Sequence, residues 1–433
     1  AGSHVRCICI KPIRGRKTGT MNWLASDAET LGCLAPSPEL LKQLMRQPLG
    51  SMPLRIQSGG TSSRCAGDGC WTLDLRKHRE IHYHEHSRDI EIGTGLTMAE
   101  LLQALRPYGR SVPIGLSGLT GSGFLLTGGM GPLSRSQGLA VDSIQAIEGI
   151  WGTGECFALS ADQSAENLRR WRALLGAAPF LAVVTRLRLR TQPVQPLRLR
   201  RGLIHPSLLP ELLQMAEQWP ETCSLQWSWG ARLEIYAVDS SDGHTTPGPL
   251  TALDPILGTD HQAAVQHCTS QLEQPRFGSL ASDIASSSPV HNEVTGRLGP
   301  ALGRKASPLI ELLSARIQQR PHDECRISAQ QLGGATTRVN RESTSFIHRD
   351  SMWKPWITAA WNPGDLAGRE RSLQWMDQVS DDLRQACPGL HLAQLHDHLP
   401  NHRQELVDAF GDWLPELHKL KAELDPEGRL PPL

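Results

Sequence analysis

The first half of the chain alternates short apolar strands with glycine turns and amphipathic helices. Residues 54–57 and 71–75 have the period-two pattern of strands, and residues 81–93 predict a hairpin around a polar turn. A helix is predicted after Thr97, because Thr97 and Glu100 have the spacing of a capping box in front of an apolar run. Strands and helices are therefore mixed, which favours an α+β fold.

The pattern is interrupted at residues 191–196, TQPVQP, and a new series of elements begins with a predicted helix at 207–219. A chain of 433 residues is long enough for two hydrophobic cores. Single cores stop growing near roughly 250 to 300 residues. We therefore place a domain boundary at this proline-rich stretch.

Charge and composition narrow the classes of partner. The chain has 44 Lys and Arg against 44 Asp and Glu, so no net charge attracts nucleic acid or an anionic membrane. No apolar run in the sequence approaches the roughly 20 residues of a membrane-spanning helix. We expect neither partner. The ten cysteines are scattered, which favours free thiols and a cytoplasmic protein, with a disulfide between Cys65 and Cys70 as the alternative.

Two glycine-rich loops are candidate binding sites. The first follows the strand at 54–57 and combines Gly59 and Gly60 with hydroxyl residues, so that amides and hydroxyls can point at one oxyanion. The second lies within residues 115–144. Neither has the spacing of a P-loop or of a dinucleotide fingerprint. Each alone is compatible with simple turns, but the two loops together favour a site for a long phosphorylated cofactor.

Several segments, taken in order, carry a family resemblance. One group of segments resembles the flavin domain of the vanillyl-alcohol-oxidase superfamily: RIQSGGTSS, LDL, IEIGTGLTMAELLQAL, SGLTGSGFLLTGGMGPLSRSQGLAVDSI and LAVVTRLRLRTQP. A second group resembles the berberine-bridge-enzyme-like branch of that superfamily: GGATTRVNRESTSFIHRD, AAW and LHKLKAELDPEGRL. The resemblance implies a split PCMH-type FAD-binding domain at 20–195 and a substrate domain at 196–385, with an antiparallel sheet backed by helices. It also implies a C-terminal return to the FAD domain at 386–433.

The resemblance further implies which residues bind FAD. Residues 57–62 would bind the pyrophosphate, residues 118–120 would lie beside the flavin ring, later glycines would allow close packing under the cofactor, and two valines would contact the adenine. The implied residues are Gln57, Ser58, Gly59, Gly60, Thr61, Ser62, Gly118, Leu119, Thr120, Gly128, Gly129, Gly131, Val183, Val184 and, near the polar edge of the flavin, Gln394. Neutral amides can hold a pyrophosphate without Lys or Arg, which suits a chain with no basic cluster.

Some positions depart from the pattern of this branch. Thr61 and Leu116 stand where its members commonly tether the flavin through His and Cys, so the expected FAD is non-covalent. Leu395 stands where the branch often has a tyrosine base. Any proton removal must therefore come from another group.

Histidines are the predicted replacement for that base. His396 and His398 alternate on the segment that holds Gln394, and His348 lies on a predicted strand. An imidazole with a pKa near roughly 6.5 suits proton removal at neutral pH. A single histidine among 17 is more often structural, and Glu234 is a further candidate.

Tryptophans in the second half predict a substrate wall. Trp227 and Trp229 alternate on one predicted strand, and Trp353 and Trp356 flank Lys354 on another. We select Trp227, Trp229 and Trp356, together with Glu234, as candidate substrate-binding residues, because flat apolar rings suit an aromatic or polycyclic molecule. Packing in the core explains tryptophans on half-buried strands equally well.

These observations predict an FAD-dependent oxidoreductase, an oxidase or dehydrogenase, that takes a hydride from a small organic substrate. Its electron acceptor would be O2 or another molecule. Two alternatives stay open: a flavoprotein without turnover that serves as a binding or assembly partner, and a D-2-hydroxy-acid dehydrogenase of the same superfamily. The latter would need an arginine pair and metal-binding histidines. The triplet His82, His84 and His86 lies on a polar hairpin, and we expect no metal there.

Overall fold

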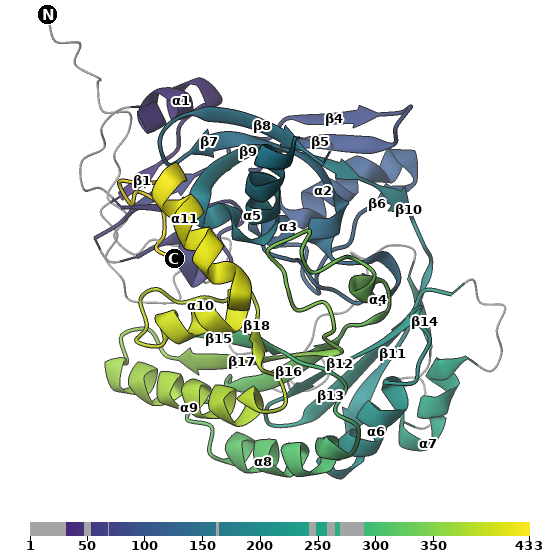
Figure 1. The fold of residues 1–433 in the computed structure, drawn as a ribbon. Helices are drawn as coiled ribbons and strands as arrows, with labels where there is room; N and C mark the ends of the chain where they lie inside the picture. The colour runs from purple at the N-terminus through teal and green to yellow at the C-terminus, as the bar shows by residue number, and fades with distance from the viewer. Residues whose placement is uncertain are drawn as a thin grey trace, which may run out of the picture.

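The computed structural model describes residues 32–46, 53–67, 69–161, 164–241, 248–257, 265–268 and 290–433. In these ranges helices are combined with several sheets, so the predicted α+β fold is confirmed. Figure 1 shows an upper region built from the first half of the chain and a lower region dominated by one large sheet. The last helices run from the lower region back to the upper one.

The first sheet of the upper region has three parallel strands in the order β1–β3–β2. These are β1 (Gly32–Leu34), β3 (Trp71–Asp74) and β2 (Leu54–Gln57). The helix α1 (Pro38–Arg46) contributes Leu41 and Met45 to a small core with Leu54 and Leu73. The two strands expected at 54–57 and 71–75 are confirmed.

A second, antiparallel sheet completes the upper region, in the order β4–β5–β9–β7–β8. Its strands are β4 (Ile81–His84), β5 (Asp89–Gly93), β9 (Ala182–Arg190), β7 (Ile144–Trp151) and β8 (Cys156–Ser160). The predicted hairpin is thus β4 and β5. The predicted helix is α2 (Met98–Leu105), and its capping box is present: Thr97 Oγ1 accepts from the Glu100 N–H at 3.3 Å, and Glu100 Oε2 accepts from the Thr97 N–H at 2.9 Å.

Shorter elements connect these sheets. They are β6 (Arg110–Ser111), α3 (Gly123–Leu126), α4 (Ser134–Gln137), α5 (Ala165–Leu181) and β10 (Gln192–Pro193). The helix α5 is broken near Gly176, whose φ of 130° is outside the range of ordinary L-residues. The break lets the chain turn into β9, which is central to the sheet.

The lower region is an eight-stranded antiparallel sheet in the order β14–β11–β13–β12–β16–β17–β15–β18. Its strands are β14 (Gln266–Cys268), β11 (Leu197–Ile204), β13 (Leu233–Asp239), β12 (Cys223–Trp229), β16 (Arg326–Gln331), β17 (Trp353–Trp361), β15 (His291–Leu298) and β18 (Gly389–Leu390). The sheets divide between β10 and β11, at the proline-rich stretch. The limits of the three domains stay a prediction, and β18 shows that the C-terminal segment also extends the large sheet.

Helices cover the outer face of the large sheet (Figure 1). They are α6 (Leu209–Ala216), α7 (Asp254–Leu257), α8 (Ala306–Gln318) and α9 (Leu366–Arg384). Apolar residues of α6, α8 and α9 pack with alternate residues of β12, β13, β16 and β17 in one core. The other face of the sheet is turned toward the upper region, so a site between the two regions is walled by this inner face.

The C-terminal segment returns to the first sheet through α10 (His402–Phe410) and α11 (Leu414–Leu424). The Leu54 N–H donates to the carbonyl of Arg429 at 2.8 Å, and Arg429 Nη1 donates to the carbonyl of Met45 at 2.9 Å. The first sheet is thus held at its edge by residues close to the end of the sequence.

Two buried arginines join the upper and lower regions. Arg135 on α4 donates to the carbonyls of Cys223 at 2.7 Å and Leu332 at 2.5 Å. Arg349 makes a two-pronged ion pair with Asp142, with both distances at 2.9 Å. Guanidinium groups that make several hydrogen bonds of this kind fix the position of the two regions relative to each other.

Three further observations bear on the sequence predictions. No helix in the described ranges is long and apolar enough to cross a membrane. Seven described cysteines, Cys65 and Cys70 among them, form no disulfide, so the alternative of a disulfide between these two is not realised. Within the described residues, no group of three or more His, Cys, Asp or Glu side chains could hold a metal ion.

Candidate functional site

A cavity of about 540 Å³ lies between the upper and lower regions. Its upper wall is made by residues 58–65 and by the second glycine loop at 115–130. Its lower wall comes from the inner face of the large sheet, and residues 391–396 close one side. Both predicted glycine loops therefore border one cavity, together with side chains that are hundreds of residues away in the sequence.

The two glycine loops touch each other directly. A Cβ on Gly121 would lie 2.8 Å from Ser58 Cβ and would collide with the amide of Gly59, and a Cβ on Gly59 would lie 2.9 Å from the Leu119 carbonyl. Ser58 Oγ accepts from the Ser122 N–H at 2.9 Å and donates to the Thr94 carbonyl at 2.5 Å. Only glycine allows this approach, and the contact fixes the upper wall.

We expect Gly121→Ala to separate the two loops and to weaken flavin binding. Real Cβ atoms do not approach backbone so closely, so the backbone must move. A loss of about 1 to 3 kcal/mol of stability is the ordinary cost of such overpacking. Gly230→Ala is a matched control, because its Cβ would meet only the flexible Arg326 side chain at 3.4 Å. Thermal unfolding of both variants measures the cost, and equal Tm values would contradict the expectation.

Part of the predicted cofactor set lines the cavity. The lining members are Ser58, Gly59, Gly60, Thr61, Ser62, Thr120, Val184 and Gln394. Gly60 has a φ of 73°, which a glycine adopts without strain and which shapes the turn of the first loop. The roles assigned to these residues stay predictions.

The other members of that set do not line the cavity. These are Gln57, Gly118, Leu119, Gly128, Gly129, Gly131 and Val183. Gln57 and Val183 are buried, and Val183 belongs to the core of the first sheet. A Cβ on Gly129 would meet Phe124 at 2.8 Å, and one on Gly131 would meet Ile114 at 2.8 Å. These two glycines therefore make room for protein atoms, and the close packing under the cofactor that the resemblance implies stays a prediction.

The inner face of the large sheet supplies Gln330, Lys354 and Trp356 to the cavity. They lie side by side, because Gln330 pairs with Lys354 between β16 and β17, and Trp356 follows Lys354 by two positions. Trp227 and Trp229 face the opposite way and pack under the helices, which corrects their assignment to a substrate wall. Glu234 is buried on β13 and also lies outside the cavity lining.

Lys354 is the least expected group of the lower wall. It is buried, and no hydrogen bond or ion pair to its Nζ is found among the described residues. Its only partner there is the Trp356 ring, whose centroid is 4.6 Å from Nζ. Burial lowers the pKa of this lysine to about 7. A large fraction of Lys354 is therefore neutral at physiological pH, and a neutral amine can accept a proton.

Three other lining residues carry buried polar atoms without a partner among the described residues. They are Arg64 Nη2, His391 Nδ1 and Gln394 Oε1. Gln394 Oε1 lies against Gly296, beside the Lys354 side chain. Unsatisfied polar atoms are uncommon in a folded interior and indicate a missing ligand. A polar ligand such as FAD, with phosphates, hydroxyls and ring amides, fits such a wall.

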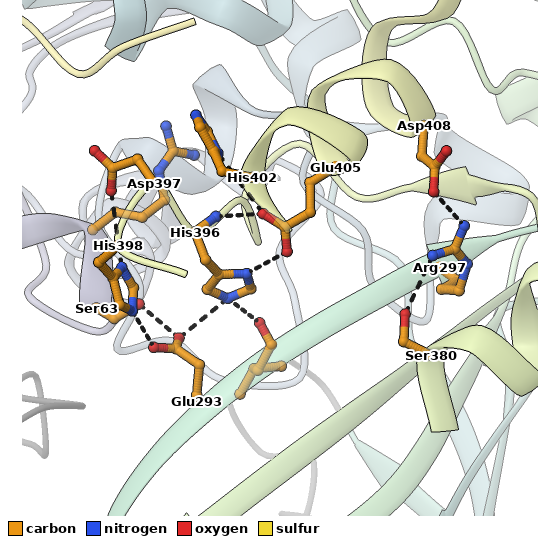
Figure 2. Close-up of polar contacts among 12 residues, drawn as sticks. Ser63, Glu293, Arg297, Ser380, His396, Asp397, His398, His402, Glu405 and Asp408 are labelled. Atoms are coloured by element: carbon orange, nitrogen blue, oxygen red, sulfur yellow. Dashed lines mark hydrogen bonds and ion pairs between the residues drawn. The ribbon is translucent and has the colours of Figure 1, made fainter. Parts of the chain in front are cut away.

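His396 was predicted as a base, but both of its nitrogens are engaged (Figure 2). Nδ1 lies 2.7 Å from Glu405 Oε1, and Nε2 lies 3.2 Å from Glu293 Oε1 and 3.0 Å from the Val294 carbonyl. Burial alone would lower the pKa of His396, but the carboxylates of Glu293 and Glu405 outweigh it and raise the pKa to about 10. His396 is an imidazolium at neutral pH and cannot take a proton there, which corrects the prediction.

The other two predicted histidines, unlike His396, lie outside the cavity lining. His398 Nε2 lies 2.9 Å from Glu293 Oε2, its side chain is 28% exposed, and it does not line the cavity. Carboxylates outweigh burial there and raise its pKa. His348 lies 3.0 Å from the carbonyl of Ala409, outside the cavity, and burial lowers its pKa. Neither is placed to act as a base in the cavity.

Glu293 is the centre of this ionic cluster, which we call the Glu293 cluster: Glu293, Ser63, His396, His398 and Glu405. Ser63 Oγ donates to Glu293 Oε1 at 2.7 Å, so the first glycine loop is tied to β15 (Figure 2). Burial opposes ionisation of Glu293, but the contacts with His396 and His398 hold its pKa well below the usual range. The cluster therefore joins the first loop, the large sheet and the C-terminal segment.

The fold and the cavity place the chain among known proteins. Residues 41–160 match the family described as FAD binding domain. The structure superposes on BBE-like 1 of Physcomitrella patens with a TM-score of 0.79 and 16% identity, covering 94% of this chain and 91% of that one. Residues 41–160 therefore match an FAD-binding domain, and the chain has the fold of berberine bridge enzyme-like proteins, so the expected resemblance is confirmed.

Curated relatives match parts of the sequence. The chain is 29% identical to the FAD-linked oxidoreductase janO of Penicillium janthinellum over 207 residues, 46% of this chain and 44% of that protein. It is 23% identical to the aclacinomycin-N/aclacinomycin-A oxidase of Streptomyces galilaeus over 359 residues, 71% of this chain and 63% of that protein. The match thus spans less than half the length of janO and under two thirds of the oxidase.

Proposed function

We propose that the chain is an FAD-dependent oxidoreductase that oxidises a small organic substrate and holds FAD without a covalent bond. One observation carries the proposal: the cavity combines a glycine-loop wall with a buried lysine that lacks a counter-charge in the described structure. A protein that only binds a partner would have no use for this costly group. The names of the relatives, FAD-linked oxidoreductase and oxidase, support the same conclusion.

The upper wall is suited to FAD. Amides and hydroxyls of residues 58–62 can donate to a pyrophosphate, and Thr120 and Val184 border the same cavity. When bound, FAD supplies the two-electron acceptor of the oxidation.

In our proposal Lys354 removes the substrate proton. The neutral amine takes the proton of a hydroxyl or amine group on the substrate while the adjacent C–H bond gives up its hydride, so a two-electron oxidation is balanced. Gln394 and Gln330 are placed to orient the polar end of the substrate beside Lys354. Trp356, Leu116 and Phe124 offer apolar surfaces in the same cavity, which suits a substrate with an aromatic or polycyclic part.

The proposed non-covalent binding rests on the two lining residues Thr61 and Leu116. Neither an aliphatic hydroxyl nor a leucine side chain forms a stable bond to the flavin ring. We expect acid precipitation of the purified yellow protein to release all of the flavin into the supernatant, where its absorption spectrum identifies it. Yellow colour retained in the pellet would contradict non-covalent binding, and a colourless preparation that takes up no FAD would contradict the proposed function.

A further inference from the structure

Arg64 lies in the upper wall and was not singled out by the sequence. It directly follows the hydroxyl residues of the first glycine loop, in a turn in which the Arg64 N–H donates to Ser62 Oγ at 3.2 Å. Its side chain borders the cavity. The guanidinium is therefore placed next to the amides and hydroxyls that are suited to a pyrophosphate.

Two contacts hold the Arg64 guanidinium in place, and one of its nitrogens has no hydrogen-bond partner among the described residues. Nη1 donates to the Leu392 carbonyl at 2.9 Å, and the group stacks over the Phe180 ring at 4.8 Å from its centroid. Nη2 is buried without a partner among the described residues. A guanidinium with an unsatisfied buried N–H₂ group is costly, since each lost hydrogen bond leaves the group desolvated.

The carboxylates nearest to Arg64 are already taken. Asp397 and Glu405 both act on Arg64 at a distance, but Asp397 is paired with Arg55 at 2.5 Å and Glu405 with His396 at 2.7 Å. Burial lowers the pKa of Arg64 only to about 10, so it stays a cation at neutral pH. The positive charge of Arg64 therefore has no direct counter-ion in the described protein.

We propose that Arg64 binds an anionic oxygen in the cavity and that this oxygen belongs to a phosphate of FAD. The proposal rests on the proposed function, because it assumes FAD as the ligand of the upper wall. The loop position favours a phosphate over a substrate group: Arg64 extends the row formed by residues 58–63, whereas Lys354 and Gln394 serve the opposite wall. The phosphate charge is thus met by one arginine in addition to neutral amides.

Binding of three probes to the flavin-free protein tests this proposal. FAD contains both the pyrophosphate and the flavin, ADP contains the adenosine and the pyrophosphate without the flavin, and riboflavin contains the flavin without a phosphate. We expect Arg64→Gln to weaken FAD and ADP by about 10- to 100-fold, as loss of a charge-assisted hydrogen bond does, and to leave riboflavin unchanged. Quenching of flavin fluorescence gives the Kd values for FAD and riboflavin, and competition with FAD gives that for ADP.

Arg172→Gln is the matched control. Arg172 also stacks on an aromatic ring, Trp413, at 3.8 Å, but it lies outside the cavity lining. We expect its probe affinities to equal those of the parent. Arg64→Lys keeps the charge in a similar volume and guards against a folding defect; we expect it to bind FAD more tightly than Arg64→Gln.

Each other outcome overturns the assignment in its own way. Equal loss of FAD and riboflavin would show that Arg64 only supports the fold. Unchanged FAD and ADP affinities, with weaker binding of an acidic compound such as a benzoate, would assign Arg64 to a substrate anion. If the parent itself bound neither FAD nor riboflavin, the proposed function would fail first, and this proposal with it.

Discussion

Replacing Lys354 by Met is expected to slow substrate-dependent flavin reduction by about 100-fold or more, because general bases contribute about that much. In the parent, the rate measured under anaerobic conditions should rise with pH through an apparent pKa of about 7, since the neutral amine is the active form. The variant should lose this rise. A stopped-flow experiment across pH 5.5 to about 9 resolves both effects.

Lys419→Met is the matched control, because Lys419 is an exposed lysine on α11 whose partner among the described residues is Glu416. Its rate and pH profile should equal those of the parent. A Lys354→Met protein that is as fast as the parent, with the same profile, would remove Lys354 from the mechanism.

Thermal unfolding of Lys354→Met distinguishes a folding defect from a loss of catalysis in this variant. The pKa of Lys354 is lowered on folding from 10.5 to about 7, so the unfolded chain binds more protons between these values and parent stability rises with pH across this window. At pH 6 the parent holds a buried charge without a counter-ion. We therefore expect Lys354→Met to unfold at the same or a higher temperature than the parent at pH 6, with a difference that shrinks toward pH 10.5.

Glu293→Gln is expected to have the largest effect on stability, about 3 to 5 kcal/mol. The amide keeps the shape of the carboxyl group but removes the negative charge that lies between His396 and His398. The buried His396 imidazolium is then left with less counter-charge, and His398 loses a carboxylate partner. Urea unfolding of the flavin-free protein measures the loss without a contribution from bound cofactor.

The control is Glu423→Gln, because Glu423 pairs with Arg169 and Arg170 at the surface and should cost about 1 kcal/mol or less. Equal costs for the two variants would show that the Glu293 cluster contributes no more than a surface network.

The pH dependence of stability follows from the same cluster. His396, with its pKa raised from 6.5 to about 10, contributes stability that is complete below pH 6.5 and is lost as the pH rises through 10. Glu405, with its pKa lowered from 4.5 to about 2, contributes stability that is present above pH 4.5 and is lost as the pH falls toward 2. The cluster should therefore stabilise the parent most between pH 4.5 and 6.5. In Glu293→Gln the free energy of unfolding should fall less than in the parent as the pH rises through 10.

The glycine loops could be predicted from sequence because the constraint is local. Gly121 has no room for a side chain, Gly60 has a φ of 73° that favours glycine, and β2 fixes where the first loop begins. The same reasoning failed for His396 and His398, which alternate along the segment that holds Gln394 and were predicted as candidate bases. The segment is irregular, and the carboxylates that hold the two histidines come from β15 and α10, which no local pattern reveals.

The tryptophans show a second limit of the sequence pattern. Period two predicts that Trp227 and Trp229 share a face, and they do, but it does not say which face is covered by helices. Successive side chains of β17 point to opposite faces of the sheet, and Trp356 occupies one of the positions that point to the cavity. Lys354 and Arg64 were missed because what distinguishes them is a buried charge without a counter-ion among the described residues. That property can be recognised only when the neighbouring side chains are known.

The return of the C-terminal segment has a consequence for how the protein assembles during synthesis. Arg64 and Leu392, which meet at the cavity, are 328 residues apart, and Arg429 bonds Met45 across 384 residues. Contacts of such long range form late, because the chain between them must be closed first. On the ribosome, the first glycine loop and the exposed edge of β2 would wait for nearly all of the described chain to emerge. Capture of the cofactor would then be among the last events of folding, and chaperone protection of that edge would matter most before this step.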